Sequence, residues 1–144
     1  MLGRSDWQHL IPHAGGMCLL DAVADWDETR IHAVSESHRD PGNPLRRDGR
    51  LHAVHLAEYG AQAAAVHGAL RARAHGVEEP RPGMLVALRD VQLQREFIDD
   101  LPAALHVHAE CLYADDAGTQ YVFRIEHAGK ELASGRVAVI HPKE

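Results

Sequence analysis

One acidic residue, Glu58, lies in a part of the sequence that is otherwise apolar or small. The segment 51–76, LHAVHLAEYGAQAAAVHGALRARAHG, is rich in alanine and predicts a helix that is buried on most of its faces. Gln62 follows Glu58 one turn later on the same side of that helix. A carboxyl group is costly to bury, so we expect Glu58 either to be paired with another group or to take part in chemistry.

Two groups of histidines have spacings that raise the question of a metal site. His52 and His55 precede Glu58 at three-residue steps, but such steps turn around a helix and spread the side chains apart. The segment 106–110 reads His-x-His-x-Glu and places these side chains on one face of an expected strand. Neither pattern has the i, i+4 spacing of a helical zinc site. A solvated face explains both better, so the sequence predicts no metal and no other cofactor.

The segments on either side of the expected helix have the patterns of β-strands. The runs 17–26 and 30–37 are separated by the turn residues Asp27 and Glu28, which predicts a hairpin. Four further strands are expected, at residues 84–93, 105–112, 119–127 and 132–140. Short turns join the last three of them, which predicts an antiparallel meander.

A long loop should deliver the chain into the helix. The segment 38–50, HRDPGNPLRRDGR, holds two prolines and two glycines, which exclude regular structure. The helix should end near Gly76, because Pro80 and Pro82 forbid its continuation. One buried helix among strands predicts an α+β domain in which an antiparallel sheet curls around the helix. Such a sheet leaves free edges, which predicts the pairing of two subunits.

The composition is that of an ordinary globular protein. With 144 residues, 45% of them hydrophobic and 25% charged, we expect a single domain over residues 1–144. The net charge of -6 argues against a protein dedicated to binding nucleic acid. Arg46, Arg47 and Arg50 form a local basic group before the helix. This group is either a solvated flank or a docking surface for an acidic partner.

The sequence also predicts a compartment. Cys18 and Cys111 form neither a disulfide framework nor a metal-binding spacing, as expected of reduced thiols in the cytoplasm. The first residues lack the apolar run of a signal peptide. The longest apolar run is too short and too polar to span a bilayer. We therefore expect a cytoplasmic protein without a membrane span.

Three segments in the first half of the chain resemble one enzyme family. Residues 11–13 (IPH) with residues 17–21 (MCLLD) resemble the PH…LLDR opening of hot-dog-fold 3-hydroxyacyl-[acyl-carrier-protein] dehydratases. Residues 38–44 (HRDPGNP) resemble the HFPG-x-P loop of that family, and residues 58–62 (EYGAQ) resemble its E-A-M-A-Q helix segment. These three segments are similar to those of a divergent branch of the family, the dehydratase-like proteins of aryl-polyene and xanthomonadin-type pigment pathways.

The resemblance implies a hot-dog fold, a curved antiparallel sheet wrapped around one long central helix. It also implies dehydration of a 3-hydroxyacyl thioester on acyl carrier protein to the trans-2-enoyl thioester, in fatty-acid or polyene biosynthesis. His38 would take the proton from carbon, and Glu58 would protonate the departing hydroxyl group. A backbone N–H of Gly42 or Gly49 would stabilise the enolate-like oxygen. Gln62 would hold the Glu58 carboxyl by an i, i+4 hydrogen bond.

Two more histidines are candidates for the substrate site. His13 follows a proline and more simply bonds to the backbone of its turn. His55 lies one turn before Glu58 and could replace His38 as the base. The chain also departs from the family pattern, because His38 stands three residues before Pro41 where the family has two.

Three alternatives remain open from the sequence. Glu58 could be a structural acid paired with an arginine, and His38 could be a loop histidine bonded to backbone. The chain could then be a non-catalytic hot-dog subunit that pairs with and stabilises an active dehydratase. The same fold also hosts acyl thioesterases. The predicted partners are an acyl carrier protein bearing a 3-hydroxyacyl chain and a second hot-dog subunit, identical or different.

Overall fold

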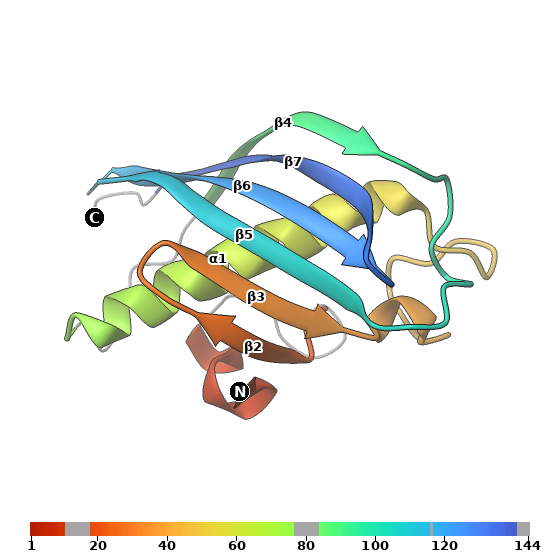
Figure 1. Cartoon of the computed structure of the whole chain (residues 1–144), viewed down its shortest axis with the longest axis horizontal. Coiled ribbons are helices and arrows are strands. Elements are labelled where there is room, and N and C mark those ends of the chain that lie inside the picture. Colours follow the sequence, from red (N-terminus) through yellow and green to blue (C-terminus); the bar gives the residue numbers. More distant parts are fainter. Residues whose placement is uncertain (11–17, 77–83, 116, 141–144) are drawn as a thin grey trace.

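A computed structural model describes residues 1–10, 18–76, 84–115 and 117–140 of the chain. One long helix, α1 (Leu56–Ala74), packs against one face of a seven-stranded antiparallel sheet that curves around it (Figure 1). This arrangement confirms the predicted α+β architecture of a sheet wrapped around a single helix. Within the described residues, no helix is both long enough and apolar enough to cross a lipid bilayer.

The order of the strands leaves β1 and β4 at the two edges of the sheet. Across the sheet the order is β1-β2-β3-β5-β6-β7-β4. The strands are β1 (Leu2–Gly3), β2 (Ala22–Trp26), β3 (Arg30–Ser35), β4 (Met84–Leu93), β5 (Leu105–Ala114), β6 (Gly118–His127) and β7 (Lys130–Ile140). Short 3-10 turns occur at Arg4–Asp6, Gln8–Leu10, Ser37–Arg39 and Ala53–His55. β4 follows the helix in sequence but pairs with β7.

The hairpin and the meander predicted from the alternation of polarity are confirmed. β2 pairs with β3, and β5, β6 and β7 pair in succession. In β6 the side chains of Tyr121, Phe123 and Ile125 are buried, as their alternation with polar residues predicted. They face α1 and form much of the core with it.

The start of the helix differs from the prediction. The sequence predicted one helix over 51–76, whereas α1 begins at Leu56. Residues 51–53 are instead joined to residues 96–98 by backbone hydrogen bonds. This pairing links segments far apart in the sequence, which local pattern does not reveal. The loop predicted to be irregular contains one 3-10 turn, Ser37–Arg39, and His38 lies in it.

Gly60 allows α1 to approach the sheet closely. A Cβ atom placed on Gly60 would lie only 2.4 Å from Cγ of Phe123. At the far end of the same ring, a Cβ atom on Gly135 of β7 would lie 2.8 Å from Cε2 and Cζ. The Phe123 ring therefore occupies the space that side chains would need at both glycines.

We expect the Gly60→Ala variant to be less stable than the wild type by about 1–3 kcal/mol, because the added methyl group overpacks the core against Phe123. The measurement is the free energy of unfolding in urea. Gly68→Ala is the matched control, since its Cβ would meet only the Tyr121 hydroxyl, at 3.9 Å. That control should be up to about 1 kcal/mol more stable than the wild type, because alanine favours helix over glycine. Equal effects of the two substitutions would contradict the close approach.

Candidate active site

His38 is held in one tautomer inside the protein. Its side chain is completely buried, and Nε2 lies 3.0 Å from the carbonyl oxygen of Leu101. A carbonyl oxygen only accepts, so Nε2 carries the hydrogen and donates it. Nδ1 is then the basic nitrogen of a neutral ring, and it has no hydrogen-bond partner among the described residues. Burial lowers the pKa of His38, which keeps the ring neutral and able to accept a proton.

Glu58 lies in the first turn of α1 and is half-buried. The sequence predicted a carboxyl group shielded from water, but the Glu58 side chain is partly exposed to solvent. Within the described part of the chain, Glu58 forms no hydrogen bond and no ion pair. Its charge acts on His55, whose pKa is lowered mainly by burial and raised in part by Glu58. A structural pair between Glu58 and an arginine of the loop is therefore not formed among these residues.

The two predicted catalytic side chains do not meet within one chain. Among the described residues, His38 and Glu58 form neither a hydrogen bond nor an ion pair with each other. The His38 ring points instead to the carbonyl group of Leu101, in the segment before β5. The catalytic pairing of His38 with Glu58 stays a prediction.

The predicted substrate-binding residues have different surroundings. The N–H of Gly42 donates to Asp40 Oδ1 at 2.8 Å, so it is already used within the loop. Gly49 has a φ of +76°, a conformation that favours glycine. Its carbonyl oxygen accepts a hydrogen bond from Arg46. The N–H that Gly49 would offer to an oxyanion stays a prediction.

Gln62 is fixed by the chain before β2. Its Oε1 accepts a hydrogen bond from the backbone N–H of Leu19 at 2.9 Å, and the side chain is buried. The predicted hydrogen bond from Gln62 to the Glu58 carboxyl stays a prediction. His55 is half-buried in the 3-10 turn that precedes α1. His13 lies outside the described residues.

The arginines before the helix hold the loop together. Arg46 donates to the carbonyl oxygens of His38 at 3.0 Å and Gly49 at 2.9 Å. Arg50 pairs with Asp99 at 3.1 Å. Arg47 bonds to carbonyl groups of the loop but is exposed and has no carboxylate partner among the described residues. Of the three predicted docking residues, Arg47 is therefore the one whose charge is most open to an acidic partner.

Sequence reasoning missed a buried polar network beside Glu58. The Tyr59 hydroxyl lies 2.7 Å from Ser37 Oγ, and Ser37 Oγ lies 2.8 Å from the carbonyl oxygen of Leu19. A tyrosine among alanines, directly after the one acid of the helix, was the signal in the sequence. Its partners come from two other segments, so the pattern alone did not identify them.

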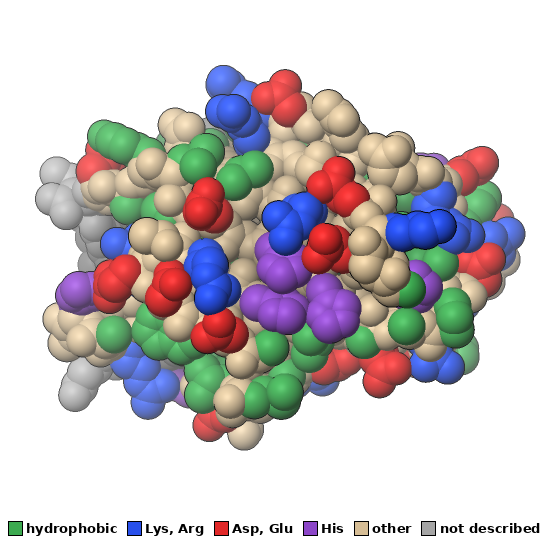
Figure 2. Space-filling view, in the orientation of Figure 1, with side chains coloured by type: hydrophobic (Ala, Val, Ile, Leu, Met, Phe, Trp, Pro, Cys, Tyr) green, Lys and Arg blue, Asp and Glu red, His purple; other side chains and the backbone are tan. Residues whose placement is uncertain are grey.

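Histidines gather on the outer face of the sheet, away from α1 (Figure 2). His32 Nε2 lies 2.9 Å from His106 Nδ1, and the rings of His32 and His108 stack at 4.4 Å. His108 turns towards Glu126, at 3.1 Å, rather than towards Glu110 in its own strand. Within the described ranges, no group of three or more histidine, cysteine, aspartate or glutamate side chains is arranged to hold a metal ion.

The stability of the protein should fall as the pH drops below the ordinary histidine pKa of 6.5. Burial lowers the pKa values of His32, His67 and His108, so the unfolded chain binds more protons than the folded protein. The contribution of these histidines to the free energy of unfolding is complete above their pKa in the unfolded chain. It is lost as the pH falls through their lower pKa values in the folded protein. The slope is about 1.4 kcal/mol per pH unit for each extra proton bound on unfolding.

Urea denaturation at a series of pH values measures this slope. Four charged groups act on the cluster of His32, His106 and His108: Asp25 of β2, Arg30 of β3, and Arg124 and Glu126 of β6. The His32→Gln variant keeps these charges and removes one of the stacked rings. In this variant the free energy of unfolding should change less with pH than in the wild type. An unchanged pH dependence would contradict a role of His32 in the loss of stability at low pH.

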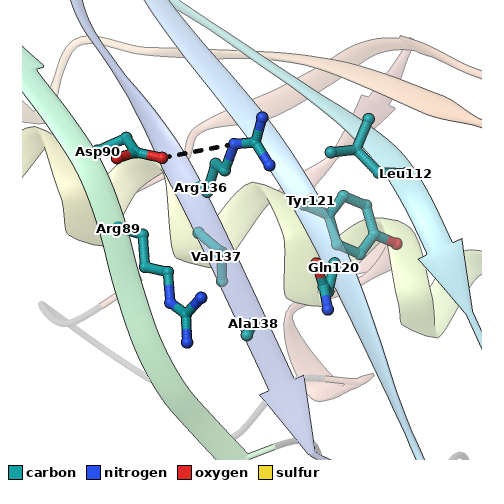
Figure 3. Close-up of a pocket in the computed structure, with 8 residues that line it drawn as sticks. All are labelled: Arg89, Asp90, Leu112, Gln120, Tyr121, Arg136, Val137 and Ala138. Carbon is teal, nitrogen blue, oxygen red and sulfur yellow. Dashed lines mark ion pairs between the residues drawn. The ribbon is translucent and has the colours of Figure 1, made fainter.

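A shallow pocket lies on the outer face of the sheet, where β4 and β7 run side by side (Figure 3). Arg89 and Arg136 are paired across these strands, and Asp90 lies 3.7 Å from Arg136. None of the predicted site residues lines this pocket. It is therefore separate from the candidate active site, which lies where the loop 37–50 meets the start of α1.

Comparison with known proteins assigns the family. A family model described as ApeP dehydratase, of the ApeP-like type, matches residues 5–144. The chain belongs to the ApeP-like dehydratase family. This confirms the resemblance to hot-dog dehydratases of pigment pathways that the three segments indicated. No curated protein sequence matches this ApeP-like chain.

Solved structures confirm the fold of the ApeP-like chain. The dehydratase heterocomplex ApeI:P from Xenorhabdus doucetiae matches with a TM-score of 0.84 and 24% identity, over 95% of this chain and 91% of that one. A protein assigned as a thioesterase from Syntrophus aciditrophicus has a TM-score of 0.68 and 13% identity, over 96% and 94%. A hypothetical thioesterase with coenzyme A from Streptococcus pneumoniae has a TM-score of 0.63 and 9% identity, over 99% and 98%. At these identities the likeness shows the hot-dog fold alone.

Proposed function

We propose that this ApeP-like chain dehydrates a 3-hydroxyacyl thioester carried on acyl carrier protein to the trans-2-enoyl thioester. The reaction would serve fatty-acid or polyene biosynthesis. The observation that carries the proposal is the state of His38. A neutral imidazole, fixed by the Leu101 carbonyl with Nδ1 unpartnered among the described residues, is the group needed to accept a proton from carbon.

The chemistry requires two proton transfers. His38 Nδ1 accepts the proton from the carbon next to the thioester carbonyl, and the electron pair of that C–H bond forms the C=C bond. The C–O bond to the hydroxyl group breaks, and Glu58, in its acid form, donates the proton that completes a water molecule. Proton exchange with solvent then restores a neutral His38 and a protonated Glu58.

A second hot-dog subunit fits this proposal. β4 lies at the edge of the sheet, and within the part of the chain that the structure describes it pairs with β7 alone. Glu58 is half-open near the start of the helix. Pairing at a free edge would cover exposed backbone and could place groups of a partner beside Glu58. The relative from Xenorhabdus doucetiae is a dehydratase heterocomplex, ApeI:P, which supports a partner that differs from this chain.

The second candidate function is a non-catalytic subunit that stabilises an active dehydratase. Two observations favour it: His38 is completely buried, and within the described residues it does not contact Glu58. In that case His38 would hold the loop to Leu101, and the active site would belong to the partner.

One assay separates these functions. The purified chain is given a 3-hydroxyacyl thioester on acyl carrier protein in three mixtures: alone, with a catalytically inactivated hot-dog dehydratase partner, and with the intact partner. Mass spectrometry follows the enoyl thioester, and a thiol reagent follows hydrolysis. Enoyl product in either of the first two mixtures supports catalysis by this chain. Product only with an intact partner supports the non-catalytic role, and free thiol without enoyl product would indicate a thioesterase.

A further inference from the structure

The Tyr59 side chain links the helix that carries Glu58 to the loop that carries His38. It follows Glu58 in α1, its side chain is completely buried, and its hydroxyl oxygen lies 2.7 Å from Ser37 Oγ. Ser37 directly precedes His38 in the 3-10 turn after β3. One hydrogen bond therefore connects the helical turn that carries Glu58 with the loop turn that carries His38.

The direction of this hydrogen bond follows from its neighbours. Ser37 Oγ lies 2.8 Å from the carbonyl oxygen of Leu19 and 2.9 Å from Ser35 Oγ, so the Ser37 hydroxyl has other acceptors for its hydrogen. Among the described residues, the Tyr59 hydroxyl has Ser37 Oγ as its acceptor, so donation from Tyr59 to Ser37 is the direction that leaves both hydroxyl hydrogens bonded. The amide group of Asn43 donates to Tyr59 at 3.4 Å. Burial raises the pKa of Tyr59, so the phenol keeps the hydrogen that it donates.

The loop that Tyr59 reaches is internally braced. Asn43 Nδ2 donates to the carbonyl oxygen of Ser37 at 2.9 Å, and Arg46 donates to the carbonyl oxygen of His38 at 3.0 Å. These bonds tie both ends of the segment 37–46 together. From α1, the Tyr59 hydroxyl contacts this segment directly, and Gln62 bonds to Leu19, whose carbonyl oxygen lies next to Ser37. The Tyr59 hydroxyl is thus a direct polar link between the helix and the loop.

We propose that Tyr59 is a positioning residue, whose hydroxyl sets the place of His38 relative to Glu58. This rests on the proposed dehydratase function. Tyr59 touches no reacting atom in this scheme and acts through Ser37. A buried hydrogen bond suits this role because losing it leaves the Ser37 oxygen without its donor and lets the loop shift. Small shifts between catalytic groups lower rates strongly.

The Tyr59→Phe variant tests the proposal, because it removes only the hydroxyl group. We expect kcat to fall by about 10- to 100-fold, since a misplacement of about 1 Å can cost that much. KM should change less, because the hydroxyl does not contact the substrate. Ser37→Ala should lower kcat to a similar extent. The double variant should lose little more than either single variant, because both remove the same link.

Tyr121→Phe is the matched control. Tyr121 is also buried, and its hydroxyl lies 2.6 Å from Nδ1 of His67 in the second half of α1. Loss of the Tyr121 hydroxyl should lower the free energy of unfolding by about as much as the Tyr59→Phe substitution does. It should leave kcat unchanged. An unchanged kcat in Tyr59→Phe, or an equal fall of kcat in both tyrosine variants, would overturn the proposal.

A second readout does not depend on turnover. Diethyl pyrocarbonate modifies accessible imidazoles, and mass spectrometry reports the rate at His38 alone. Modification of His38 should be faster in Tyr59→Phe than in the wild type, and unchanged in Tyr121→Phe. If the wild type dehydrates nothing with any partner, the proposed function fails while this comparison still decides the role of Tyr59. Equal protection of His38 in all three proteins would refute that role.

Discussion

The Glu58→Gln variant is expected to lose dehydration by a factor of about 100 to 10,000, the range that general acid catalysis contributes. Glutamine has nearly the same shape as glutamate but carries no acidic hydrogen for the departing hydroxyl group. The fold should be kept, because Glu58 is half-buried and forms no hydrogen bond or ion pair within the described residues. Formation of the enoyl thioester in a single turnover measures the loss, and thermal unfolding checks the fold.

Glu110→Gln serves as its control. Glu110 is exposed in β5, a strand that lies against the helix only through its opposite face. Its replacement also removes one negative charge and should leave turnover unchanged. Turnover of Glu58→Gln near the wild-type rate would remove Glu58 from the mechanism and favour the non-catalytic subunit.

The second large effect is expected from His38→Gln. The glutamine amide can still donate a hydrogen bond to the Leu101 carbonyl, but it offers no basic nitrogen. Turnover should therefore fall by about 100-fold or more, with a small change in stability. In the wild type, burial lowers the pKa of His38, so kcat/KM should be maintained as the pH falls through 6.5 and be lost only at lower pH.

His67→Gln is the matched control for His38. His67 is also completely buried, and its Nε2 lies 2.7 Å from the carbonyl oxygen of Asp27. The control should lose stability, because the bond from Tyr121 is disturbed, yet keep its turnover. If His38→Gln turns over like the wild type, another base such as His55 would have to act, and His55→Gln would then abolish the reaction.

The sequence predicted the elements of the fold well, because their signals are local. Alternation of polar and apolar side chains identified the hairpin and the meander, and the alanine-rich run identified α1. The start of the helix at Leu56 was missed, because residues 51–53 pair with residues 96–98. That pairing depends on how distant segments meet, and no local pattern encodes it.

The site was predicted less completely than the fold. His38 and Glu58 stand out by residue type, but the Ser37–Tyr59 hydrogen bond joins residues 22 positions apart. The contact between His32 and His106 joins residues 74 positions apart. Both became visible only when the register of β3 and the path of the following loop were known. Residue type therefore indicates the candidates, whereas their partners depend on the tertiary structure.

The position of β4 has a consequence for biosynthesis. β4 is made directly after α1, yet its partner in the sheet is β7, whose residues begin about 40 positions later in the chain. During translation, β4 leaves the ribosome before β7, so it cannot pair with β7 until β5, β6 and β7 have been synthesised. For that interval both of its edges are open to other chains. The exposure of β4 therefore lasts for as long as the three following strands take to be synthesised.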